Sequence, residues 1–400
     1  MTSLSLPNRD KMEKQQVFFI QLLYDFLHEK ETIIESDVDW LKIFHIADKQ
    51  QLQAIVYYQC HDNMPESIKD KFRNAYFGTL YYYTNYKSII AAISEEFEKN
   101  DILYITIKGL TISDYYPIPA LRSMGDIDVL IKNKDRQEAS VILQKKGFTI
   151  QPHVDNREWG FSQNGFMIEL HDHLVYDDLV SNSALKNFFN NTWQYYKNGV
   201  LDISFHFIYI LIHLRKHLMN CGVGFRQFLD IAMISKNANN LNWEWIVHTL
   251  NDLNLSKFAS ICMSFICEWF GVVTPIQTVK IDDEFYNTVT QTTFKNGVFG
   301  FYNTDNITNA AVNTARGGKN PQIEMIKSAI KFVFPPYNHL IAYDPYKFVE
   351  RKPFLIPIAW LYRLFRGLKK TREGRRWLSL KFASKETISK RDSYLKKWGL

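Results

Sequence analysis

Apolar side chains recur every three or four residues through much of the first hundred positions, a spacing that places them on one face of a helix. The longest such series follows Pro65, a residue that favours the start of a helix. A shorter series starts near Asp39, with Trp40 and Ile43 on a common face. Residues 1–100 are therefore predicted to form a helical N-terminal region.

The pattern then changes to that of a strand, with β-branched and aromatic residues over 102–107. Lys108 and Gly109 follow as a turn, and residues 110–116 predict a short helix that Pro117 stops. The chain thus predicts a strand, a glycine turn and a helix in that order.

Residues 126–131 alternate between polar and apolar side chains, which predicts a second strand. Ile127 and Val129 face one way along this strand, and Asp126 and Asp128 face the other. The apolar side is the one that a buried strand needs, and the acidic side requires a separate explanation.

A hairpin is predicted around Asn164-Gly165, because this dipeptide is a strong turn signal between two alternating segments. The remaining elements of this stretch are one helix and three strands, at 136–146, 148–154, 157–163 and 166–174. A small mixed α/β unit is therefore expected over residues 101–176. Its predicted strands lie both before and after the Asn164-Gly165 turn.

Helical periodicity returns after residue 182, and residues 177–300 are predicted to be a helical region. Asparagine, glycine and proline accumulate over 303–322, which indicates a linker. We expect residues 301–400 to hold this linker and a basic helical C-terminal region. The predicted fold class is α+β, with a small mixed β-sheet core embedded between helical N- and C-terminal regions.

Composition narrows the class of protein. The chain has 400 residues, of which 46% are hydrophobic, so it can bury substantial cores and is not a disordered or fibrous protein. Its 4 cysteines form no Cys-x-x-Cys pair and are too sparse for a disulfide framework. The longest apolar stretch, 203–214, is too short for a bilayer span, and no signal peptide is recognisable at the start. We expect a cytoplasmic protein.

Charge is distributed unevenly along the chain. Residues 351–400 contain 15 Lys and Arg against 3 Asp and Glu, whereas the rest is mildly acidic. An acidic body argues against a broad nucleic-acid-binding face. The basic tail leaves two alternatives open, contact with an anionic membrane surface or packing as a terminal helix.

The residues that indicate chemistry are acidic. Asp126 and Asp128 stand two positions apart on one strand, so their carboxylates share a face and can chelate a hard divalent cation. Glu169 lies on a later predicted strand, on the same face as His171 and His173. Acidic residues on strands of one small sheet are typical of a metal site for phosphoryl chemistry.

The same stretch carries groups that suit phosphate. Lys108 and the Gly109 amide come directly after the first strand, and Arg122 and Ser123 shortly precede the acidic pair. Backbone amides in a turn and basic side chains are common phosphate ligands. Lys108, Gly109, Arg122 and Ser123 are therefore the predicted nucleotide-binding residues.

Taken together, these motifs resemble the uncharacterised nucleotidyltransferase family of the polymerase-β-type superfamily. The resemblance rests on Lys108-Gly109, on Arg122 with Asp126-Ile127-Asp128, and on Glu169-Leu170-His171, and covers roughly residues 38–370. It implies metal binding by Asp126, Asp128 and Glu169, with Mg²⁺ or Mn²⁺ as the ion, and an NTP co-substrate held near Gly109. The superfamily often has Ser after this glycine, whereas Leu110 stands here.

The reaction so implied is transfer of a nucleoside monophosphate to an unknown acceptor, with release of pyrophosphate. The acceptor is open between a small molecule, a glycan and a protein. His171, His217 and Arg226 are predicted substrate contacts, although a pairing of Arg226 with Asp230 at helical spacing is an equal alternative. Two other classes stay open: an inactive nucleotide-binding scaffold or regulator, and a membrane- or polyanion-binding protein that acts through its tail.

Overall fold

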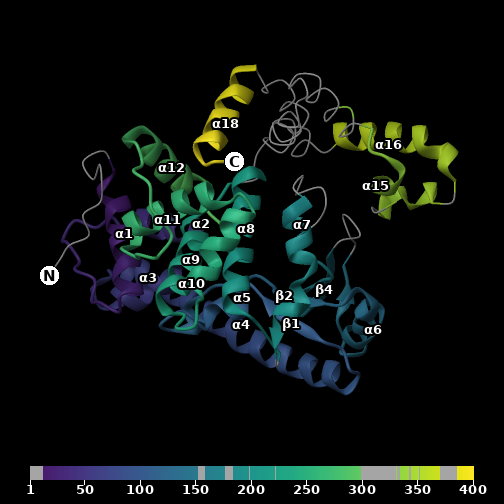
Figure 1. Cartoon of the computed structure of the whole chain (residues 1–400), viewed down its shortest axis with the longest axis horizontal. Coiled ribbons are helices and arrows are strands. Elements are labelled where there is room, and N and C mark those ends of the chain that lie inside the picture. Colours follow the sequence, from purple (N-terminus) through teal and green to yellow (C-terminus); the bar gives the residue numbers. More distant parts are fainter. Residues whose placement is uncertain are drawn as a thin grey trace.

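The computed structural model confirms the α+β class, with a five-stranded mixed sheet lying between helical segments (Figure 1). It describes residues 12–151, 158–175, 183–197, 199–220, 222–298, 330, 334–341, 344–350, 352–369 and 385–400. The predicted linker at 303–322 lies outside these residues.

The described part of the first hundred residues, 12–100, is mainly helical, as the periodicity predicts. Asp39 accepts a hydrogen bond from the Lys42 amide at 3.0 Å and so caps the second helix, while Pro65 precedes the longest one. The helices are α1 (Lys14–Leu27), α2 (Trp40–Gln50), α3 (Gln53–Cys60) and α4 (Glu66–Lys99).

The sheet has the order β1-β2-β5-β4-β3. β2 and β5 run parallel as neighbours, and the other pairs are antiparallel. The strands are β1 (Tyr104–Ile107), β2 (Ile127–Ile131), β3 (Thr149–Ile150), β4 (Glu158–Gln163) and β5 (Phe166–His171), with α5 (Gly109–Ser113) and α6 (Arg136–Lys145) between them.

The predicted hairpin is confirmed. Asn164 and Gly165 both have positive φ, 51° and 85°, which is the backbone that a two-residue hairpin turn requires. The turn pairs Gln163 with Phe166 and fixes the register of β4 and β5. As a result, Phe166, Ile168 and Leu170 are buried on one face, while Glu169 faces the other way.

The two faces of the sheet have different surroundings. One face packs on α4 and α6, where Tyr86, Phe97 and Leu143 join Val129 and Leu170 in a continuous apolar core. In Figure 1, α4 runs beneath the strands. The opposite face carries the acidic residues and turns towards the helical segment that follows the sheet.

That segment packs around a large aromatic core. The Trp269 ring lies 4.9 Å from that of Phe225 and 5.0 Å from that of Phe228, contacts that link two of its helices. Its elements are α7 (Ser183–Asn190), a short hairpin of β6 (Tyr196–Lys197) and β7 (Val200–Leu201), α8 (Ile203–Asn220), α9 (Phe225–Asn237), α10 (Trp243–Asp252), α11 (Ser256–Phe270) and α12 (Asp283–Asn296).

The end of the chain returns to this aromatic core. Trp398 follows the last helix, is fully buried, and has its ring 5.3 Å from that of Phe265. Part of the basic tail therefore packs as a terminal helix. The C-terminal elements are α15 (Tyr337–Ile341), α16 (Ile356–Lys369) and α18 (Lys385–Lys397).

Three details differ from the sequence prediction. The strand expected at 148–154 is formed only by Thr149 and Ile150 in the described residues, and the strand expected to reach residue 174 ends at His171. The hairpin of β6 and β7 falls in a region predicted to be helical. In the described part of the chain, no helix combines the length and the apolarity that a membrane span needs.

Candidate functional site

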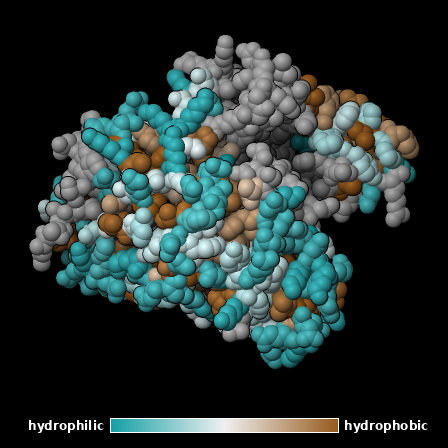
Figure 2. Space-filling model, in the orientation of Figure 1, coloured by the Kyte–Doolittle hydropathy of each residue, from teal (hydrophilic) through white to brown (hydrophobic). Residues whose placement is uncertain are grey.

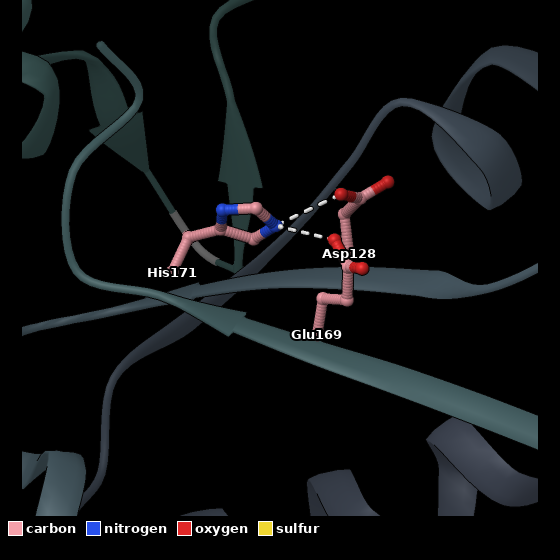
Figure 3. A group of neighbouring side chains, drawn as sticks. All are labelled: Asp128, Glu169 and His171. Atoms are coloured by element: carbon pink, nitrogen blue, oxygen red, sulfur yellow. Dashed lines mark hydrogen bonds and ion pairs between the residues drawn. The ribbon is translucent and has the colours of Figure 1, made fainter. Parts of the chain in front are cut away.

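Asp128 and Glu169 lie side by side on the face of the sheet opposite α4 and α6. They are directly paired residues of the neighbouring parallel strands β2 and β5. His171 lies two positions further along β5 on the same face, and donor atoms of the three side chains lie within 4.8 Å of one another (Figure 3). The structure thus brings together two carboxylates and an imidazole.

Asp128 is the centre of this group. Its Oδ1 lies 2.8 Å from His171 Nε2 and 2.7 Å from Lys108 Nζ, and its side chain is 5% exposed. Burial disfavours the charged form, but the Lys108 ammonium and the His171 contact outweigh burial and hold the pKa of Asp128 below its ordinary value. The carboxylate is therefore ionised at neutral pH.

Asp126 stands immediately before β2 and lines the same pocket as Asp128. Burial and the negative charge of Asp128 raise its pKa above the ordinary value. Among the described residues it makes no hydrogen bond or ion pair, and the nearby Lys108 and Arg226 charges offset the effect of burial only in part. The turn before it is held by Tyr86, whose hydroxyl donates to the Gly125 carbonyl at 2.7 Å.

Lys108 has an unusual backbone, with φ 54° and ψ −121°. Such a conformation is costly for a residue with a side chain and persists only where its surroundings fix it. Two contacts fix it here: the Nζ contact with Asp128, and a hydrogen bond that the Lys108 amide donates to His206 Nε2 at 3.3 Å. The strained residue therefore lies at the centre of the candidate site.

His206 is neutral in this arrangement. Burial, with the nearby Arg122 and Lys108 charges, lowers its pKa to about 4. Its Nε2 accepts a hydrogen bond, so the proton of the neutral ring lies on Nδ1. His206 acts on the site through the Lys108 backbone.

A pocket of about 260 Å³ opens between this face of the sheet and helices α8 and α9. Lys108, Gly109, Asp126, Asp128 and Glu169 form its wall on the sheet side. The helices contribute Ile210, His213, Leu214, His217, Arg226 and Gln227. Charged groups of both signs thus line one small cavity.

His213 and His217 face each other across one turn of α8, with their Nε2 atoms 2.9 Å apart. Burial and nearby positive charges lower both pKa values, that of His217 to about 4. Since one Nε2 must donate and the other accept, the two rings are held as a neutral pair.

Arg226 brings a buried positive charge to the pocket. Its Nη1 donates to Gln51 Oε1 at 2.9 Å and to the carbonyl and hydroxyl oxygens of Ser123, all of which are neutral. No carboxylate in the described residues forms an ion pair with it. Burial and the neighbouring Arg122 lower its pKa to about 10, so it remains a cation.

The predicted pairing of Arg226 with Asp230 is wrong. Asp230 instead forms a bidentate ion pair with Arg122, with both contacts at 2.8 Å, and accepts a third bond from Tyr116. The planar guanidinium of Arg122 binds both oxygens of the Asp230 carboxylate, although the two residues are far apart in sequence. This two-point contact is more favourable than a contact of Asp230 with Arg226 across one turn of α9. Arg122 is thereby fixed beside Gly109.

The remaining predicted residues are placed as follows. Gly109 and Arg122 line the pocket, whereas Ser123 is not among the lining residues, and its hydroxyl donates to the Gln51 carbonyl. His173 lies beyond the end of β5 and contacts Asp172. Gln51, His206 and His213 were not predicted as site residues. Helical periodicity shows which residues share a face but does not reveal a chemical role.

Comparison with known proteins agrees with this geometry. The family model of an uncharacterised nucleotidyltransferase matches residues 36–271, more than half of the chain. The chain belongs to this family. Neither a curated protein nor a solved structure gives a significant match. The predicted resemblance is confirmed, although its part beyond residue 271 falls outside the match.

The family match includes every residue that lines the pocket from the sheet, α8 and α9. The match supports a general role in nucleotidyl transfer for the chain. The match includes neither the C-terminal helix α16 nor α18.

Proposed function

We propose that this protein transfers a nucleoside monophosphate from an NTP to an acceptor hydroxyl or phosphate and releases pyrophosphate. The observation that carries the proposal is the direct pairing of Asp128 with Glu169 beside Asp126, at the wall of a pocket that also holds Lys108 and Arg226. The acceptor is a small molecule, a glycan or a protein.

The donor atoms suit a divalent cation. Asp128 and Glu169 offer carboxylate oxygens, and His171 offers an imidazole nitrogen. Oxygen ligands favour Mg²⁺ or Mn²⁺, and the added nitrogen is more readily accepted by Mn²⁺. An ion held here would offset the negative charge of the triphosphate.

Lys108 has a double role in this proposal. Its ammonium neutralises Asp128 in the present structure, at 2.7 Å. With a divalent ion held by Asp128 and Glu169, the Lys108 ammonium would be available to a phosphate oxygen in the same pocket. Lys108 therefore neutralises Asp128 in this structure and would contact the triphosphate of the substrate.

Arg226 and the Gly109 segment would hold the leaving pyrophosphate. Arg226 is a cation with only neutral partners, which suits a multiply charged anion. A cavity of about 260 Å³ is slightly smaller than the usual range for small-molecule sites, so we expect it to take the phosphates and leave the base outside.

In the reaction, the acceptor oxygen would form a bond to the α-phosphorus while the bond from that phosphorus to the bridging oxygen breaks. Glu169 would take the acceptor proton, because it is the more exposed of the paired carboxylates, with 28% of its side chain accessible against 5% for Asp128. Pyrophosphate leaves with the bonding electron pair.

Incubation with each α-labelled NTP, Mg²⁺ or Mn²⁺ and a cell extract tests the proposal. A new labelled species that requires the protein is expected, and Asp126→Asn should abolish it. Asp114→Asn is the matched control, because Asp114 forms an exposed ion pair with Lys87 away from the pocket. Absence of any labelled product with every nucleotide and both ions would contradict transfer.

A nucleotide-binding scaffold is the second candidate. It is favoured by one observation, that Asp128 is already neutralised by Lys108. NTP binding without turnover would indicate it: a ligand at one hundred times its dissociation constant stabilises the folded state by about 2.7 kcal/mol. A thermal melt with Mg²⁺ and each NTP, run beside the transfer assay, distinguishes the two.

A further inference from the structure

Helix α16 has a small apolar core of its own. Leu340, Tyr346, Val349 and Ala359 are buried together, and Trp360 packs against them. The Trp360 indole N–H also donates to the Pro335 carbonyl at 2.9 Å. One face of α16 is therefore occupied by its neighbours from residues 335–349.

The opposite side of this segment carries a largely exposed apolar stripe, although the Tyr362 ring contacts those of Tyr346 and Phe348. Its side chains are 76%, 54%, 55%, 47% and 65% exposed, in the order Phe354, Ile358, Leu361, Tyr362 and Phe365. The spacings of four, three, one and three residues keep them in one stripe along the helix. Brown surface is visible over the α15–α16 segment at the upper right of Figure 2.

The charge around this stripe is of a single sign. The segment from 351 to 372 has no Asp or Glu, and its basic residues are Arg351, Lys352, Arg363, Arg366, Lys369, Lys370 and Arg372. A surface that combines large apolar side chains with only positive charge is complementary to an anionic lipid surface.

We propose that α16 binds the protein to an anionic membrane surface, with its apolar stripe inserted among the lipid headgroups. The helix has 14 residues, about 21 Å at 1.5 Å per residue, so it lies along the interface and does not cross it. This inference does not rest on the proposed transferase activity. It concerns a segment outside the family match.

Protein partners fit the stripe less well. A second copy of the chain would have to bring carboxylates to the basic flanks and an apolar groove to the aromatic side chains. A lipid surface satisfies both requirements without a matching shape.

Co-sedimentation of the full-length protein with vesicles tests the proposal. We expect the protein to pellet with phosphatidylcholine vesicles that contain phosphatidylglycerol, to remain in solution with phosphatidylcholine alone, and to be released by salt. Leu361→Asp with Phe365→Asp should weaken binding by about tenfold or more, because two apolar side chains lose their burial in lipid.

The matched control is Leu41→Asp with Phe77→Asp. These residues are 51% and 58% exposed on α2 and α4, so the variant changes the same residue types and the same charge elsewhere on the surface. It should bind vesicles as the wild type does. Unchanged melting of both variants confirms that each is folded.

Three results would overturn the proposal. The first is wild-type protein that stays in solution with the anionic vesicles. The second is equal loss of binding in the stripe variant and the control variant, which would reflect net charge alone. The third is a wild-type dimer that the stripe variant dissociates, with no vesicle binding, which would assign the stripe to a second copy of the chain.

Discussion

The ion pair of Lys108 with Asp128 sets the electrostatics of the pocket at the scale of single residues. Both side chains are largely buried, 18% and 5% exposed, and each shifts the other's pKa towards the charged form. Loss of one partner leaves a charge in a poorly solvated place. Asp128, which is proposed to bind metal, therefore also stabilises the fold through Lys108 when no metal is bound.

Asp128→Asn should therefore lower the free energy of unfolding by about 3 kcal/mol, because it strands the Lys108 ammonium. Lys108→Met combined with Asp128→Asn should recover most of this loss. Denaturant unfolding of the wild type, both single variants and the double variant measures the coupling. Additive effects in this cycle would show that the pair contributes no interaction energy.

Glu169→Gln should reduce turnover far more than NTP binding, because Glu169 serves the acceptor oxygen and not the triphosphate. The amide keeps the size of the side chain and its place opposite Asp128 on β2. Steady-state rates and NTP titration by calorimetry separate the two effects. A variant with normal turnover and weakened NTP binding would assign Glu169 to substrate binding.

Sequence reasoning reached the acidic residues because strand alternation fixes which side chains share a face. Asp128 and Glu169 were predicted to lie on the same side of one sheet, and they are directly paired. The contact of His171 with Asp128 was not predicted, since alternation does not reveal that β2 and β5 are neighbours. Arg122 with Asp230 was missed for the same reason, as 108 positions separate them.

At the scale of elements, α8 supplies three histidines to the site region, of which His206 is buried and His213 and His217 are partly buried. His206 and His217 have pKa values of about 4, and that of His213 is also lowered, with burial as the main cause in each. The ordinary value for histidine is about 6.5. These rings are neutral in the folded chain and take up protons more readily when it unfolds.

The sign of the resulting pH dependence follows from linkage. Above about pH 6.5 the rings are neutral in both states, and as the pH falls towards about 4 the unfolded chain gains protons that the folded chain does not. The unfolding free energy should therefore decrease between pH 6.5 and pH 4. His206→Gln should make this decrease shallower.

Chemical denaturation at a series of pH values measures this slope. His248→Gln is the control, because His248 is 76% exposed in its side chain and contacts only Asp252 on the surface of α10. It should leave the slope unchanged. Equal slopes for wild type and His206→Gln would contradict a neutral buried ring at this position.

Local signals decided how well each element could be predicted. Asn164-Gly165 gave the hairpin with its register, because that dipeptide favours the required positive φ values. The same dipeptide occurs at 198–199, between β6 and β7. It did not lead to a predicted hairpin, because helical periodicity dominates the surrounding sequence. β3 is shorter than predicted, because the strand propensity of a segment does not determine how many of its residues pair with the neighbouring strand, here β4.

For the whole molecule, the main feature is the return of the C-terminus to the helical body. Trp398 packs among Phe228, Phe265 and Phe285, and Arg391 donates to the Leu218 and Met219 carbonyls at the end of α8. A basic cap of this kind offsets the negative end of a helix. Composition identified the tail as basic but gave no sign of its anchoring tryptophan.

Trp398→Ala should lower the free energy of unfolding by about 3–5 kcal/mol, the usual effect of removing a fully buried tryptophan. Tyr362→Ala on α16 is the control, because Tyr362 is 47% exposed and its loss should have little effect. Denaturant unfolding compares them. If Trp398→Ala unfolds at the same midpoint as the wild type, the end of the chain is not part of the cooperative fold.

The proposed nucleotidyl transfer is tested most directly by following two differently labelled nucleotides with the same protein. Label in the α-phosphate should pass to the acceptor and label in the γ-phosphate should leave as pyrophosphate, in the presence of Mg²⁺ or Mn²⁺. Asp126→Asn, which breaks no ion pair in the described structure, should abolish both events. Transfer of the γ-label to the acceptor, or release that persists in Asp126→Asn, would contradict the account.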